Sequence, residues 1–211
     1  MKKYIAEFIG TFAMIFCGTG AIIINQETGG MISHSGVATV WGLIVAAMIY
    51  TFGDISGAHL NPAVTIAFWV AKVFPGKEIL PYVISQLIGA LLASVTLHIL
   101  FPNNKLLGAT LPAGTPIQSF ILEIVLAFLL MLTIIHLAKG SKEQGMFAGL
   151  AIGSVVLLEA MFAGPICGAS MTPIRSLSPA LVSSHTEHLW IYLSAPFIGA
   201  TTAIGVWKLL R

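Results

Sequence analysis

Two related motifs place polar residues between the long apolar stretches of this chain. Residues 57–63 read Gly-Ala-His-Leu-Asn-Pro-Ala, and residues 168–174 read Gly-Ala-Ser-Met-Thr-Pro-Ile. In each motif a good N-capping residue, Asn61 or Thr172, stands directly before a proline, which is the order favoured where a helix begins. The motifs therefore predict two short helices whose N-termini, each with a positive dipole end, face each other within a membrane.

The side chains around these helix starts are candidates for contact with a passing molecule. The Asn61 amide can donate to a passing oxygen, and the Thr172 hydroxyl can both donate and accept; the alternative is that each only caps its own helix. Ile174 either packs against a neighbouring helix or narrows the path between the two helix starts along which such a molecule would pass. His59 either lines the inner vestibule or is a loop histidine bonded to backbone.

Four charged residues lie among the apolar stretches, where a charge is costly and is functional by default. Arg175 follows Thr172 by one turn, and we expect it to bind solute oxygens and to exclude cations, a tie to loop carbonyls being the alternative. Glu7 and Glu123 are expected to accept N–H bonds from the two non-helical loops, whose backbone must be satisfied inside the protein. Glu159 either braces the outer loops or tunes the charge beside the passage.

Other classes of function find little support in the sequence. The chain has no His-Glu-x-x-His, no Gly-x-Ser-x-Gly and no close pair of acids, so we expect it not to be an enzyme. It shows no metal-ligand spacing, and we expect neither a metal nor a cofactor. Its net charge of +2 has no basic cluster, which argues against nucleic acid as a partner. A coupled transporter would need a coupling-ion site, which no cluster of acids supplies.

The composition indicates a protein of the lipid bilayer. Hydrophobic residues make up 57% of the chain and charged residues only 9%, against about 25% charged in soluble domains. Two apolar stretches, 61–71 and 173–183, are too short to cross a bilayer and are expected to be re-entrant half-helices. We therefore predict an all-α membrane protein with two half-helices and six transmembrane helices of about 20 residues, near 4–25, 36–54, 79–100, 117–138, 145–164 and 188–209.

The order of these stretches predicts one channel domain, 1–211, made of two repeat halves of opposite orientation, about 1–105 and 115–211. Each half has three spans with a half-helix after the second, and an odd number of spans inverts the second half, which places a site at the midplane. The positive-inside rule then puts both termini in the cytoplasm, with the loops at 25–35, 101–116 and 183–188 outside. The basic residues on the predicted inner side are Lys2, Lys3, Lys72, Lys77, Lys139, Lys142, Lys208 and Arg211.

Several motifs resemble the aquaporin, or major intrinsic protein, family over essentially the whole chain. They are Ala-Glu-Phe-Ile-Gly-Thr at 6–11, Ser-Gly-Ala-His-Leu-Asn-Pro-Ala-Val-Thr at 56–65, Gly-Ala-Ser-Met at 168–171 and Arg-Ser at 175–176. The stretch 159–165 is most similar to the nodulin-like intrinsic proteins and their bacterial aquaglyceroporin-type relatives. One departure is clear, because Thr-Pro-Ile stands at 172–174 where the family has a second Asn-Pro-Ala.

The resemblance implies an outer selectivity filter formed by Trp41, Ala160, Ala169 and Arg175. Such a ring is wide and apolar on one side, whereas water-selective members tend to carry histidine at the position of Ala160. It implies a passive channel for small uncharged polar solutes (glycerol, urea and neutral metalloid acids such as arsenite) and water, a mainly water-selective channel being the alternative. It also implies a homotetramer with one pore per subunit, and we expect the cytoplasmic membrane of a bacterium as its location.

Overall fold

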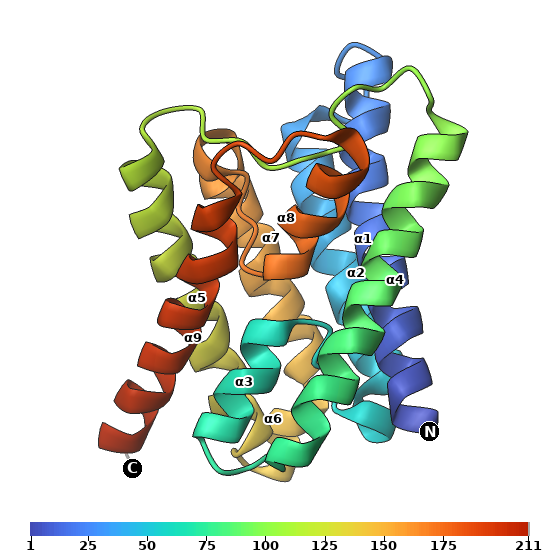
Figure 1. Cartoon of the computed structure of the whole chain (residues 1–211). Helices are drawn as coiled ribbons and strands as arrows, with labels where there is room; N and C mark the ends of the chain where they lie inside the picture. Colours follow the sequence, from blue (N-terminus) through green and yellow to red (C-terminus); the bar gives the residue numbers. More distant parts are fainter. Residues whose placement is uncertain (211) are drawn as a thin grey trace.

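The computed structural model describes residues 1–210, and in that range the long elements are all helices (Figure 1). Six of them are long and apolar enough to cross a membrane, as the composition predicts. Their outward faces carry exposed apolar side chains such as Ile84, Ile88 and Leu92, as a lipid-facing surface requires. The six are α1 (Lys2–Glu27), α2 (Ser33–Ser56), α4 (Ile79–Leu100), α5 (Pro116–Ala138), α7 (Ala148–Cys167) and α9 (Leu189–Leu209).

Two half-helices, α3 (Pro62–Val70) and α8 (Pro173–Ser183), lie inside the bundle. Figure 1 shows α3 in the half of the bundle that holds both chain termini and α8 in the opposite half, with their N-terminal ends directed at one another. Neither half-helix crosses the bundle. The predicted architecture of six spans and two re-entrant helices is therefore confirmed.

The fifth span begins later than the sequence pattern predicts. The expected start at 145 falls within a separate short helix, α6 (Lys142–Met146), and α7 begins only at Ala148 and continues to Cys167. Ser141 starts α6 with a capping box, in which its hydroxyl accepts from Gln144 N and its backbone N–H donates to the Gln144 side chain. A further one-turn helix, η1 (Gly76–Glu78), precedes α4.

Glycines bring the helices of each half into close contact. A Cβ atom at Gly89 of α4 would collide with the Phe8 carbonyl of α1, and one at Gly199 of α9 would collide with the Ile124 carbonyl of α5. These two contacts occupy matching places in the two halves, and such close backbone approach is typical of small residues in membrane helices. The inverted repeat is thus a feature of the helix packing as well as of the sequence.

The halves meet along α2 and α7. A Cβ at Gly42 would lie 2.6 Å from the Gly153 carbonyl oxygen, and a Cβ at Gly153 would lie 2.5 Å from the Gly42 carbonyl oxygen. The contact is reciprocal, as expected where a pseudo-twofold axis passes between two elements.

Candidate pore

The loops that lead into the half-helices have the same unusual backbone. In the first loop Gly57 has φ 83°, Ala58 has φ 45° and Leu60 has φ 50°; in the second, Gly168, Ala169 and Met171 have φ 82°, 43° and 55°. Residues other than glycine rarely adopt this left-handed backbone region, so contacts with the surrounding structure must hold the two loops in this conformation. Residues 61 and 172 then return to extended backbone and begin α3 and α8.

Glu7 of α1 holds the first loop. One carboxylate oxygen accepts the His59 N–H at 2.9 Å, and the other accepts the Leu60 N–H at 2.8 Å. Ser56 Oγ and Gln86 Nε2 donate to the same carboxylate, each at 2.7 Å. Four donors therefore surround this fully buried acid. Two of them are backbone N–H groups of a turn that has no helical hydrogen bonds, so the carboxylate supplies the acceptor that these groups need.

Glu123 of α5 holds the second loop in the matching way. Its two oxygens accept the N–H groups of Ser170 at 2.7 Å and Met171 at 2.8 Å. A tyrosine assists each loop, because Tyr82 donates to the Ser56 carbonyl and Tyr192 donates to the Cys167 carbonyl. Tyr82 and Tyr192 occupy corresponding places in the two halves, as do the N–H groups of His59 and Leu60 and those of Ser170 and Met171.

Asn61 connects the two half-helices. Its Oδ1 accepts the Ala63 N–H at 2.8 Å and so caps α3, while its Nδ2 donates to the Met171 carbonyl of the opposite loop at 2.9 Å. One N–H of the amide is therefore used within the protein, and the second is left for the cavity that Asn61 lines. Asn61 thus caps α3 as the alternative has it, and donation of its remaining N–H to a passing oxygen stays a prediction.

Thr172 behaves differently at the start of α8. Its side chain makes no capping hydrogen bond, and its buried Oγ1 has no partner among the described residues. The capping alternative for this side chain was therefore wrong, although the hydroxyl of another N-cap threonine, Thr115, does cap α5. Thr172 lines the same cavity as Asn61.

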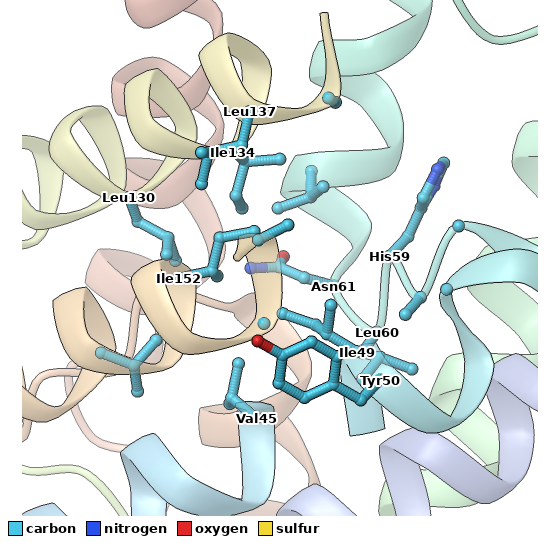
Figure 2. A pocket seen from close by; sticks show the side chains of 18 of the residues that line it. Val45, Ile49, Tyr50, His59, Leu60, Asn61, Leu130, Ile134, Leu137 and Ile152 are labelled. Atoms are coloured by element: carbon cyan, nitrogen blue, oxygen red, sulfur yellow. The ribbon is translucent and has the colours of Figure 1, made fainter. Parts of the chain in front are cut away.

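A cavity of about 830 Å³ leads from the end of the bundle that holds the termini to this junction. Figure 2 shows the Asn61 side chain reaching in among apolar side chains of α2, α5 and α7, including Val45, Leu130 and Ile152. Lys142 and neighbouring loop residues line its mouth, and Trp41, Ala169 and Thr172 lie at its inner end. The passage is thus apolar along its walls, with polar groups at the half-helix starts.

Arg175 and Trp41 meet beyond that inner end. The guanidinium carbon of Arg175 lies 4.9 Å from the centre of the Trp41 ring, and Nη1 donates to the Gly108 carbonyl at 2.7 Å. Arg175 is 3% exposed. The hydrogen bond to a loop carbonyl, weighed as an alternative role for Arg175, is therefore present, and it uses only part of the five N–H donors of the guanidinium.

The remaining predicted residues divide between the cavity and the packed interior. His59 lines the cavity and also packs against the rings of Phe68, Phe74 and Tyr82. Ile174 is 2% exposed, belongs to the apolar core and does not line the cavity, which supports packing over pore narrowing.

Two residues of α7 lie close to the junction without lining the cavity. Ala160 is buried one turn after Val156, which does line it. The carboxyl oxygens of the neighbouring Glu159 are buried and have no hydrogen-bond partner among residues 1–210. Bracing of the outer loops by Glu159 is therefore contradicted.

Several contributors to the site were missed from the sequence. Gln86 and Ser56 complete the environment of Glu7, and Gly108 supplies the carbonyl that fixes Arg175. Tyr82 and Tyr192 could have been found, because they stand at corresponding places in the two halves. A single glutamine, serine or glycine carries no comparable signal.

Comparison with known proteins places the whole chain in one family. The profile described as "Major intrinsic protein" matches residues 1–207. Nodulin-26 of Glycine max is 44% identical over 100% of this chain and 78% of its own length, and Aquaporin NIP1-1 of Oryza sativa subsp. japonica is 43% identical over 100% and 75%. The X-ray structure of the aquaglyceroporin from Plasmodium falciparum superposes with a TM-score of 0.88 at 25% identity, covering 98% of this chain and 95% of that one.

The chain belongs to the major intrinsic protein family. It is accordingly a multi-pass membrane channel for water and small solutes, and not an enzyme.

Proposed function

We propose that the protein is a passive channel for small uncharged polar solutes, namely glycerol, urea and neutral metalloid acids such as arsenite, in addition to water. One observation carries this proposal: a cavity of about 830 Å³ with largely apolar walls ends at the two half-helix starts, where Asn61 and Thr172 line it. A solute with a carbon backbone and hydroxyl groups fits such a passage, because it needs both apolar contact and hydrogen bonds.

The midplane contacts follow from Asn61 and Thr172. The second N–H of the Asn61 amide donates to a solute oxygen, and the unpartnered Thr172 Oγ1 donates or accepts. The two helix dipoles, each equivalent to about half a positive charge, oppose cations at this point and orient hydroxyl groups or water. Because that field comes from backbone, it does not require a second asparagine.

The outer filter is proposed to consist of Trp41, Ala160, Ala169 and Arg175. The contact between Trp41 and Arg175 supports it, since the ring supplies an apolar wall beside the N–H groups of the guanidinium. Alanine at 160 and 169 leaves room for a solute larger than water. The similarity to the solved aquaglyceroporin from Plasmodium falciparum supports a filter of the aquaglyceroporin kind.

The proposal also covers the domain organisation of the chain, its orientation in the membrane and its oligomeric state. Glu7 and Glu123 act as loop-bracing residues of one channel domain with two inverted halves. Both termini lie at the end of the bundle where the predicted inner lysines also lie, which supports a cytoplasmic location for that end in the cell membrane. The family resemblance supports a homotetramer with a pore in each subunit.

A permeability panel in liposomes tests the proposal. Stopped-flow light scattering would compare water, glycerol, urea and arsenite against protein-free vesicles, with a large sugar as the non-permeant osmolyte. We expect glycerol and urea flux above the protein-free rate and indifference to pH and sodium gradients. Passage of water alone would favour the water-selective alternative and contradict the wide filter. Steep dependence on either gradient would contradict a passive channel.

A further inference from the structure

Glu159 is the most unusual buried group outside the roles described so far. It is 7% exposed, and neither carboxyl oxygen has a hydrogen-bond partner among residues 1–210. In that part of the chain a salt bridge forms only between Lys3 and Glu78, so no cation is paired with Glu159. Buried polar groups in proteins nearly always have a partner, and an exception points to water or a ligand.

Its position on α7 points toward the solute path. Gly149, Ile152 and Val156 of α7 line the cavity, and Glu159 and Ala160 are the next residues along that face of the helix. Cys167, Ser170 and Thr172 follow at the second loop, where Thr172 Oγ1 is likewise unpartnered. Glu159 thus stands on α7 beside the filter position Ala160, about one turn beyond the cavity-lining residue Val156.

The repeat shows that this carboxyl is not required by the fold. The residue at the corresponding place in the first half is Met48, which packs against the apolar core. The helix pair α2 and α7 is otherwise closely matched, down to the reciprocal contact of Gly42 and Gly153. A side chain of similar length without polar atoms therefore serves the same packing position.

We propose that Glu159 is a further specificity-determining residue that binds solutes carrying several hydroxyl groups, a conclusion that rests on the proposed solute channel. Ionising an unpaired carboxylate in this apolar setting would be far more costly than keeping the proton. A neutral carboxylic acid has one O–H donor and a carbonyl acceptor, which matches the donor and acceptor of a hydroxyl group. Arg175 offers only donors, and Glu159 adds an acceptor beside the outer filter.

The test compares glycerol with water permeability in liposomes for the wild type, Glu159→Met and Glu159→Gln. Loss of one hydrogen bond to the solute is worth about 1–1.5 kcal/mol, or roughly tenfold. We expect Glu159→Met to lower the ratio of glycerol to water permeability by about that factor and Glu159→Gln, which keeps a donor and an acceptor, to retain it. Met48→Leu is the matched control in the other half and should leave the ratio unchanged.

The outcomes separate the two proposals. An unchanged ratio in Glu159→Met, or an equal fall in Glu159→Gln, would overturn the role of Glu159 while leaving the channel intact. A wild type that passes water and no glycerol would instead overturn the proposed solute class. If Glu159→Met does not reach the membrane, Glu159→Ala removes the same oxygens without adding bulk, and the same fall in the ratio is expected.

Discussion

The two halves of the molecule share a backbone and differ in how their polar groups are used. In the first half Glu7 accepts four hydrogen bonds and Asn61 both caps its helix and bonds across the midplane. In the second half Glu123 accepts two N–H bonds, and Thr172 Oγ1 and the Glu159 carboxyl have no partner in the described chain. Glu7 and Asn61 of the first half are thus bonded within the protein, whereas Thr172 Oγ1 and the Glu159 carboxyl of the second half are not.

One substitution explains part of this contrast. Gln86 of α4 donates to Glu7 and to Thr65 Oγ1, whereas Pro196 of α9 stands at the matching place and cannot donate. The second loop is held by small hydroxyl groups instead, with Ser170 and Thr110 both bonded to Ser176. The scaffold is conserved between halves while its side-chain network is not.

Replacement of the two bracing acids provides the strongest test of this contrast. Glu7→Leu removes the acceptor shared by four buried donors and Glu123→Leu removes the acceptor of two backbone N–H groups, at about 1–3 kcal/mol for each donor left unpaired. We expect both variants to be destabilised, with Glu7→Leu the more severe, in thermal unfolding of the detergent-solubilised protein. Glu187→Gln, at an exposed loop position, is the control. An equal fall in melting temperature in both Leu variants would mean that Glu7 and Glu123 stabilise their loops to the same extent, which would contradict the contrast between the halves.

Replacement of Arg175 tests whether a side chain of the second half contributes to the barrier against ion permeation. Arg175→Ala should raise proton and cation leak by about tenfold if the guanidinium charge adds roughly 1.4 kcal/mol to the barrier. Val64 stands at the corresponding place in α3, and Val64→Ala should leave the leak unchanged. Leak would be measured with a pH-sensitive dye inside vesicles. No change in Arg175→Ala would assign the barrier to the half-helix dipoles alone.

The smallest effect is expected from making the second half more like the first. In Thr172→Asn the new amide oxygen can accept from the Ile174 N–H as Asn61 accepts from Ala63, which should stabilise the protein by about 1 kcal/mol. The melting temperature should rise by a few degrees, with a modest change in solute ranking. Thr172→Val, which removes only an unpartnered hydroxyl, is the control and should show no such gain. A lower melting temperature in Thr172→Asn would contradict this account of the cap.

The architecture could be predicted from the sequence because its signals are local or repeated. Span lengths follow from apolar runs, the half-helices from Asn-Pro and Thr-Pro, and the inversion from three spans per half. The start of α7 was placed too early because Gly145 and Met146 continue an apolar run, whereas the capping box at Ser141 begins a separate short helix that ends at Met146.

The polar network was less predictable, because it depends on contacts between distant segments. The bond from Asn61 joins residues 110 positions apart, and the missing cap at Thr172 depends on how its side chain is oriented in the folded loop. For Glu159 the sequence left open whether it braces the outer loops or tunes the charge beside the passage, since the sequence shows that an acid is present and not which groups come within its reach. Single residues such as Gly108 acquire a role only through a side chain far away in the chain.

The reciprocal contact of Gly42 and Gly153 has a consequence for how this molecule tolerates change. At a pseudo-symmetry axis each residue faces its own counterpart, so a methyl group added on one side presses on the carbonyl of the other. The absence of a side chain at Gly42 and at Gly153 therefore sets how closely α2 and α7 approach each other, and a larger residue at either position would push the two halves apart.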